Sequence, residues 1–358
     1  MNSSVTAADT SVRKHALVVG ATGVIGRHIA AELAADWTVS GIAHSFPPEF
    51  LPHVQQLQAD LLNPRSIESS LQGIGNVSHV FYCAYKPAAD WDAATESNAA
   101  MFSNVLAQVA ASDHLERVVL ITGTKVYGVH QKAVLTPILE SDPRHAPPNF
   151  YFNQADALMA AQHGRRWSWT ELRPHTLCGL SPGTPMSLAT ILAVYGAVCR
   201  ELRVPMRFPG SQRAYEVLYQ VTDAALFGRA ARWAATSADA SNQAFNITNG
   251  EGFRWQRMWA LVARSLGVQP GPPSTFSLQE FMSDKAPVWE AMVARHGLKP
   301  YRMDQLANWQ FADYALSNEW DILSSTTKAR LHGFTEAVDS AAMFARLFDL
   351  MRKESIIP

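Results

Sequence analysis

Short apolar runs alternate with longer amphipathic stretches along the first half of the chain. Most of these runs have the length and the side chains of buried parallel strands. They occupy residues 16–19, 38–43, 54–59, 79–84, 117–121 and 169–172. Between them, residues 27–35 are rich in helix formers, and residues 97–111 carry Met101, Val105 and Val109 at four-residue intervals. This alternation predicts an α/β fold, a Rossmann-like doubly wound parallel sheet.

The pattern changes after residue 180, where prolines punctuate the chain around one apolar helix at residues 188–200. A strand is predicted at residues 244–247, and from Phe253 onward the chain is helical and rich in tryptophan. We therefore expect a smaller, mainly helical C-terminal lobe that binds the substrate. The expected division is a Rossmann domain over residues 1–180, to which a segment at about 215–250 returns, and a substrate-binding lobe over residues 181–358.

Composition and charge exclude several classes of protein. Apolar residues make up 47% of the 358 residues, enough for a large core, and the formal net charge is -1 without a basic stripe, which argues against a nucleic-acid partner. The longest apolar stretch, residues 188–199, is too short to span a bilayer, so no membrane partner is expected. This stretch could lie in the core or at an interface between two copies, so a monomer and a homodimer both stay open. The cysteines Cys83, Cys178 and Cys199 are widely spaced, which predicts no metal site and a reducing, cytoplasmic location.

A glycine-rich loop joins the first strand to the first helix. Glycines at three-residue intervals allow a tight turn, a close approach of the backbone to a pyrophosphate, and close packing of helix on strand. The helix N-terminus then offers free N–H groups to the phosphates. The residues expected at the pyrophosphate are Gly20, Thr22, Gly23, Val24, Ile25 and Gly26.

The residues after the second and third strands bear on the choice of dinucleotide. His44 and Ser45 end the second strand, and no carboxylate follows until Glu49, so nothing repels a 2′-phosphate. The lack of a carboxylate therefore favours NADP(H). Because no arginine is present there to bind a 2′-phosphate, NAD(H) stays open. Asp60 follows the third strand, where a carboxylate can accept a hydrogen bond from the adenine amino group.

Two further motifs carry a resemblance to a known family. Residues 122–127 read Thr-Gly-Thr-Lys-Val-Tyr and residues 149–152 read Asn-Phe-Tyr-Phe. The chain resembles the extended short-chain dehydrogenases/reductases, and within them the subfamily of progesterone 5β-reductase and iridoid synthase-like enzymes. Further segments agree, among them Arg173-Pro174, Pro287-Val288-Trp289-Glu290 and His332-Gly333-Phe334.

The sequence departs from the superfamily at the catalytic motif. A Tyr-x-x-x-Lys pair is usual in the superfamily, but Ala155 stands four residues after Tyr151. The subfamily shows the same departure, and its resemblance implies catalytic roles for Tyr151 and Lys125. Phe152 replaces the second tyrosine of the subfamily motif, which leaves Tyr151 as the hydroxyl of that motif.

The resemblance implies reduction of an activated C=C bond by NADPH through 1,4-hydride addition to an enone or enal. The partner would be a small apolar carbonyl compound. A carbonyl or alcohol dehydrogenase of the same superfamily, and a cofactor-binding protein without turnover, are the alternatives. The further cofactor-binding residues that it implies are Leu61, Cys83, Ala84, Thr122, Gly123, Lys125, Tyr151, Pro174, His175 and Leu177.

Overall fold

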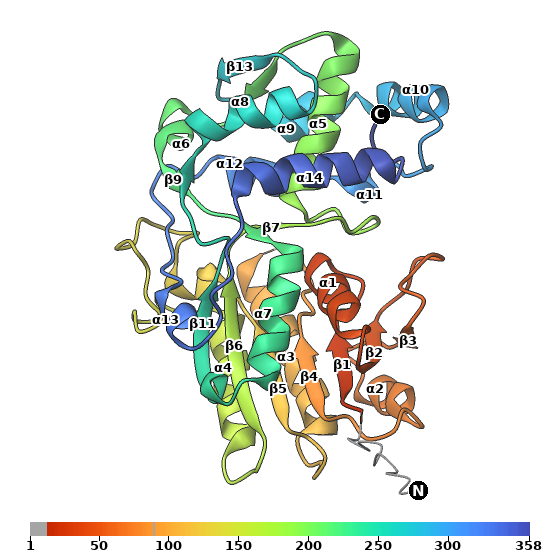
Figure 1. Cartoon of the computed structure of the whole chain (residues 1–358), viewed down its shortest axis with the longest axis vertical. Coiled ribbons are helices and arrows are strands. Elements are labelled where there is room, and N and C mark those ends of the chain that lie inside the picture. Colours follow the sequence, from red (N-terminus) through yellow and green to blue (C-terminus); the bar gives the residue numbers. More distant parts are fainter. Residues whose placement is uncertain (1–12, 89) are drawn as a thin grey trace, which may run out of the picture.

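Seven parallel strands form the central sheet of the computed structural model, which describes residues 13–88 and 90–358 (Figure 1). The strand order is β11-β6-β5-β4-β1-β2-β3. The strands are β1 (His15–Val19), β2 (Thr38–Ala43), β3 (Val54–Gln58), β4 (His79–Tyr82), β5 (Arg117–Ile121), β6 (Ser168–Pro174) and β11 (Gln243–Ile247). The order reverses between β1 and β4, and ligands of doubly wound sheets bind at such a switch point. The predicted Rossmann-like sheet is therefore confirmed.

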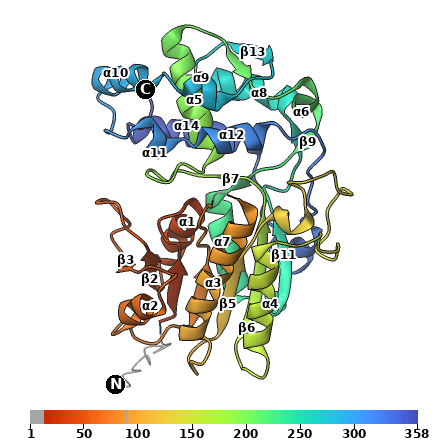
Figure 2. The ribbon, with the colours of Figure 1, turned by 180° about the vertical axis from the view of Figure 1, so that it is seen from behind.

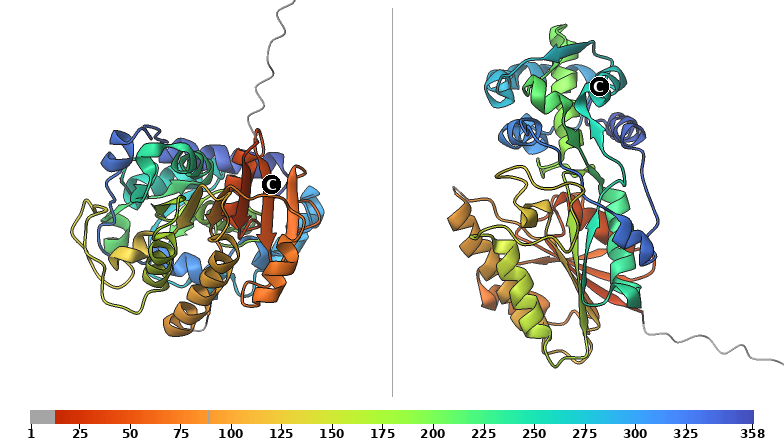
Figure 3. Two further views of the ribbon diagram at one scale, coloured as in Figure 1. Left: turned by 90° about the horizontal axis from the view of Figure 1, so that it is seen from below. Right: turned by 90° about the vertical axis from the view of Figure 1, so that its left-hand side faces the viewer.

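Helices cover both faces of this sheet, which Figure 3 shows nearly edge-on. One face packs against α1 (Val24–Leu33) and α7 (Ala224–Thr236), which lie side by side, with Ile29 and Phe227 among the buried residues. The other face packs against α2 (Pro64–Leu71), α3 (Trp91–Val109) and α4 (Phe150–Gln162). Because both faces are covered, β1, β4 and β5 are apolar after their first residues, which are His15, His79 and Arg117.

The lobe lies beyond the carboxyl ends of the strands, at the top of Figures 1 and 2. Its long central helix is α5 (Leu188–Leu202), whose first twelve residues are buried, as the apolar run predicts. The helices around it are α6 (Gln212–Glu216), α8 (Trp255–Ser265), α9 (Leu278–Met282), α10 (Ala286–His296), α11 (Met303–Leu306), α12 (Trp309–Leu316) and α14 (Ser340–Lys353). Short strand pairs accompany them: β8 (Met206–Phe208) with β13 (Pro270–Pro273), and β9 (Leu218–Tyr219) with β12 (Phe253–Arg254).

Two later segments return from the lobe to the sheet. The segment that contains α7 and β11 adds a strand beside β6 and a helix beside α1. Near the C-terminal end, α13 (Thr327–Leu331) packs on β11, and the Lys328 ammonium donates to the Ala244 carbonyl. The pair β7 (Leu177–Cys178) and β10 (Thr222–Asp223) connects the two parts. We propose the division into a Rossmann domain over residues 1–180, with residues 215–250 returning to it, and a lobe over residues 181–358.

Helix starts differ from the predicted ones for local reasons. The helix predicted at 97–111 begins at Trp91, because the Asp90 carboxylate accepts a hydrogen bond from the backbone N–H of Ala93 and so caps the first turn. The helix predicted at 27–35 begins at Val24, directly after Gly23. In the described part of the chain, no helix has the length and apolar character that a membrane crossing requires.

Candidate active site

The glycine loop lies at the switch point of the sheet, between β1 and α1. Gly20 has a φ of +84°, which a side chain would strain, and a Cβ there would lie 2.7 Å from the Ala84 backbone nitrogen. A Cβ on Gly26 would overlap the Gly20 carbonyl oxygen. Both glycines are therefore required by the close contact between the loop, the start of α1 and the segment that follows β4.

The N-terminus of α1 is open to an anion. No side chain caps Gly23, so the first N–H groups of the helix and its dipole remain available. The hydroxyls of Ser181 and Thr184 donate to the Thr22 carbonyl, at 3.2 and 3.0 Å, and tie the lobe to this loop. These features fit the pyrophosphate of a dinucleotide, and the expected pyrophosphate residues all lie here.

The remaining cofactor candidates gather along the carboxyl edge of the sheet. His44 and Ser45 follow β2 and are exposed, while Cys83 and Ala84 follow β4. Asp60 follows β3, and one of its carboxylate oxygens already accepts from the Leu62 backbone N–H at 3.0 Å. Leu61, by contrast, is buried in the core between the sheet and α2. The sheet order thus brings together residues that the sequence keeps far apart.

Lys125 and Tyr151 come from separate elements after β5. Lys125 lies on the 3₁₀ helix η1 (Thr124–Tyr127), and Tyr151 lies in the first turn of α4. Asn149 links them: its side-chain oxygen caps α4 by accepting from the Tyr151 backbone N–H at 3.0 Å, and its amide donates to the Lys125 carbonyl at 3.0 Å. The Asn-Phe-Tyr motif therefore begins with a residue that holds both candidates in place.

The Tyr151 hydroxyl faces Gly123, at the end of β5. A Cβ built on Gly123 would lie 3.9 Å from this hydroxyl and 3.4 Å from the Pro174 carbonyl oxygen. Because Gly123 lacks a side chain, the space between the Tyr151 hydroxyl and the Pro174 carbonyl stays open. Burial raises the pKa of Tyr151 above the usual value of a phenol, so the group keeps its proton at neutral pH. Ala155, one turn further along α4, supplies no charge that would favour a phenolate.

Lys125 lies between two aromatic rings. Its ammonium nitrogen is 5.0 Å from the ring centroid of Trp91 and 5.1 Å from that of Tyr314, which belongs to α12 of the lobe. None of the described residues forms a hydrogen bond or ion pair with this ammonium group. Burial lowers the pKa of Lys125, because an apolar environment disfavours the charged form. Lys125 is therefore a desolvated cation at the junction of sheet and lobe.

The segment that follows β6, which contains His175, borders the site next to β10. The His175 backbone N–H donates to the Thr222 hydroxyl, and its Nδ1 lies 2.7 Å from the Thr124 hydroxyl. Its Nε2 is buried and has no partner among the described residues. Burial lowers the pKa of His175 to about 3, so the ring is neutral. This unpaired nitrogen fits a polar group of a ligand bound beside Pro174 and Leu177.

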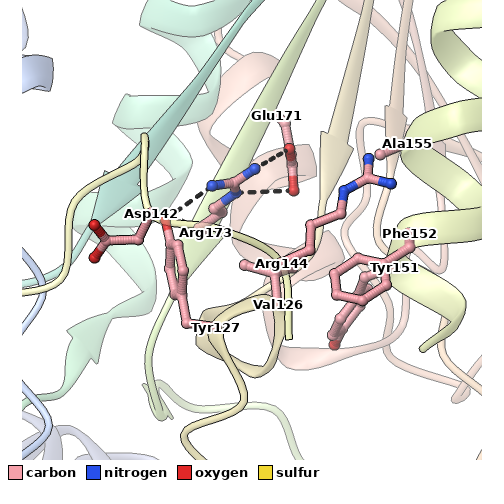
Figure 4. Close-up of a pocket in the computed structure, with 9 residues that line it drawn as sticks. All are labelled: Val126, Tyr127, Asp142, Arg144, Tyr151, Phe152, Ala155, Glu171 and Arg173. Carbon is pink, nitrogen blue, oxygen red and sulfur yellow. Dashed lines mark hydrogen bonds and ion pairs between the residues drawn. The ribbon is translucent and has the colours of Figure 1, made fainter. Parts of the chain in front are cut away.

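A buried polar network lines a small pocket next to Tyr151 (Figure 4). The Glu171–Arg173 ion pair and Tyr127 line one side of a small pocket, and Tyr151 and Phe152 line the other. Tyr127 donates to Asn246 at 2.7 Å and accepts from Arg173 at 2.9 Å, so its hydroxyl is already satisfied. Tyr127 is thus structural. The Thr122 hydroxyl donates to Glu171 at 2.6 Å and its backbone N–H donates to the Leu172 carbonyl at 3.0 Å, so both of its donors are already used.

Sequence patterns missed several residues around the site. Trp91 and Tyr314 carry no motif, and only the packing of α3 and α12 brings them to Lys125. Among the Met and aromatic residues of the lobe, the candidates for the walls of an apolar cavity are Met186, Tyr195, Phe281, Trp309 and Phe311. Tyr195 instead lies in the core of the lobe, with its hydroxyl on the Arg207 carbonyl. Apolar side chains at helical spacing are not by themselves a signal of a binding site.

Comparison with known proteins identifies relatives along nearly the whole chain. Residues 53–358 match the PRISE-like Rossmann-fold domain family. An (S)-8-oxocitronellyl enol synthase of Nepeta cataria is 32% identical over 96% of this chain and 93% of its own length. A short chain dehydrogenase of Penicillium aethiopicum is 32% identical over 96% of this chain and 99% of its own length.

Solved structures confirm the fold. A UDP-glucose 4-epimerase from Thermotoga maritima superimposes with a TM-score of 0.69 at 14% identity, over 95% of this chain and 99% of that one. The enzyme WbmH of Bordetella bronchiseptica, solved with NAD+, gives a TM-score of 0.66 at 17% identity, over 96% of this chain and 99% of that one. At such identities the likeness extends to the fold alone.

Proposed function

Because the chain belongs to the PRISE-like Rossmann-fold family, a family of oxidoreductases, we propose that it reduces activated C=C bonds of enones or enals with NADP(H). The observation that carries this proposal is the protonated Tyr151 phenol beside Gly123, with Lys125 supplied by η1 instead of the tyrosine's own helix. A group that holds its proton suits the stabilisation of an enolate, because that reaction needs a hydrogen-bond donor.

The glycine loop and the α1 N-terminus would hold the pyrophosphate of the cofactor, and the His175 segment would contact the nicotinamide end. Bound there, a reduced nicotinamide supplies a hydride to the β-carbon of the substrate. The expected pyrophosphate residues and the residues at the ends of β4, β5 and β6 lie along one edge, which supports a single extended dinucleotide site.

Tyr151 would donate a hydrogen bond to the carbonyl oxygen as negative charge develops on it. A donor of this kind, already positioned in a partly dehydrated site, contributes about 3 kcal/mol to the stability of the transition state. The Lys125 ammonium would add a positive charge next to that oxygen or to the ribose hydroxyls. Trp91, Phe150 and Tyr314 surround the position with aromatic surface, which suits an apolar substrate.

A product assay on the purified protein tests this proposal. NADPH consumption would be followed with 2-cyclohexen-1-one, citral and progesterone, and the products identified by mass and retention. A saturated carbonyl product is expected. An allylic alcohol would instead identify a carbonyl reductase, and cofactor binding without turnover on every compound would favour a protein without catalysis.

Replacement of Tyr151 tests the residue that carries the mechanism. Tyr151→Phe should lower kcat about 100- to 1,000-fold and leave NADPH binding intact, because only the donor to the enolate is lost. Tyr215→Phe is the matched control, since Tyr215 lies on α6 of the lobe. An unchanged kcat in Tyr151→Phe would remove the phenol from the mechanism.

A further inference from the structure

The end of β2 lacks a cation of its own. His44 and Ser45 are exposed, and neither residue forms a side-chain hydrogen bond with any described residue. In dinucleotide-binding folds, this position lies beside the adenosine ribose, where an arginine accommodates the 2′-phosphate of NADP(H). Any such cation must therefore come from another element.

Arg27 supplies a guanidinium group next to this position. It lies in the first turn of α1, directly after Gly26, and its guanidinium carbon is 5.4 Å from the ring centroid of Phe50. Phe50 packs edge-on against Phe46 at 5.0 Å, and Phe46 directly follows Ser45. No sequence motif marks Arg27, because nothing local relates α1 to the segment after β2.

Arg27 has no anionic partner in the described part of the chain. No carboxylate of the described residues forms an ion pair with it, and its side chain makes no hydrogen bond among those residues. Burial lowers the pKa of Arg27 from the usual value of a guanidinium, but the group remains protonated at neutral pH. On the same helix, by contrast, Glu32 pairs with Arg232 of α7 at 2.9 Å.

A guanidinium stacked on an aromatic ring keeps its N–H edge free. That edge matches the oxygens of a phosphate, and a partly buried cation without a partner is stabilised when an anion binds it. We propose that Arg27 binds the 2′-phosphate of NADP(H) and thereby makes the chain prefer NADP(H) to NAD(H). This inference rests on the proposed function, since it requires the dinucleotide site.

Binding of adenosine fragments to the intact apo protein tests the inference without any turnover. Calorimetry would compare adenosine 2′,5′-bisphosphate with adenosine 5′-monophosphate, which differ only in the 2′-phosphate. The wild type should bind the bisphosphate at least about tenfold more tightly, because a hydrogen bond to a charged group is commonly worth one factor of ten or more. Arg27→Met should remove this advantage and leave the affinity for the monophosphate within about twofold.

Two further variants complete the experiment. Arg27→Lys should retain part of the preference, because it keeps the charge but loses the planar fork. Arg257→Met, on the exposed surface of α8, changes the net charge equally and should keep the full preference. An advantage that persists in Arg27→Met would overturn the inference.

The remaining outcomes separate this inference from the proposed function. Equal weakening of both fragments in Arg27→Met would assign the residue to the pyrophosphate or to the loop, and would also overturn the inference. A wild type that binds both fragments equally would contradict the NADP(H) preference but leave a dinucleotide site in place. Failure of the wild type to bind either fragment would contradict the proposed function itself.

Discussion

At the scale of single residues, the environment of Lys125 distinguishes it from an ordinary surface lysine. The ammonium lies between the rings of Trp91 and Tyr314 and has no carboxylate partner among the described residues. Burial lowers its pKa below the usual 10.5, and Lys125 also contributes to the lowered pKa of His175. A lysine in this position loses its proton at a lower pH than a solvated one.

This environment predicts an alkaline limb in the pH profile of kcat/KM. The charged form acts in the proposed mechanism, so activity should fall as the pH rises through the lowered pKa of Lys125. Lys125→Arg should move that limb to higher pH, because a guanidinium stays protonated. The measurement is kcat/KM between pH 6 and 10.5 for both proteins. A limb at the same pH in both would show that another group titrates.

At the scale of elements, α4 and η1 form one unit through Asn149. The same side chain caps the helix that carries Tyr151 and holds the carbonyl of Lys125. The position of the two catalytic candidates therefore depends on a residue that touches no substrate in the proposed mechanism. The sequence motif contained this asparagine, but only the structure shows what it does.

A pair of variants separates the two tasks of Asn149. Asn149→Ala should destabilise the protein by about 1 kcal/mol through loss of the cap, and should also lower kcat. Asn149→Ser keeps a capping oxygen but lacks the amide that donates to Lys125, so it should regain most of the stability and little of the activity. Urea unfolding and steady-state kinetics measure the two effects. Full activity in Asn149→Ser would show that the contact with Lys125 is dispensable.

At the scale of the whole molecule, several histidines are buried in their neutral form. Burial lowers the pKa of His79 and His130 to about 4 and that of His175 to about 3. In the unfolded chain these groups bind protons near pH 6.5. Between about pH 6.5 and 4 the unfolded state thus binds more protons than the folded state, so stability falls as the pH falls.

Acid should therefore begin to destabilise the protein at pH values well above those at which carboxylates titrate. Each such histidine should lower the free energy of unfolding by up to about 1.4 kcal/mol per pH unit below 6.5. Urea unfolding at pH 7.5, 6.0 and 5.0, followed by tryptophan fluorescence, measures this slope. His130→Phe should reduce the slope, because both ring nitrogens of His130 are buried without a partner among the described residues. His163 is exposed, so His163→Phe should leave the slope unchanged. Equal slopes in the two variants would contradict the assignment of the slope to buried histidines.

Local patterns were sufficient for the sheet, the glycine loop and the Lys125 and Tyr151 motifs. Strands and turns depend on residues a few positions apart, so apolar runs and glycine spacing can be recognised along the chain. The side chains around Lys125 and the position of Arg27 could not be found this way. Trp91, Tyr314 and Phe50 meet them only because the strand order and the packing of α1, α3 and α12 bring distant segments together. Contacts of this kind depend on the packing of whole elements, and no short stretch of sequence encodes that packing.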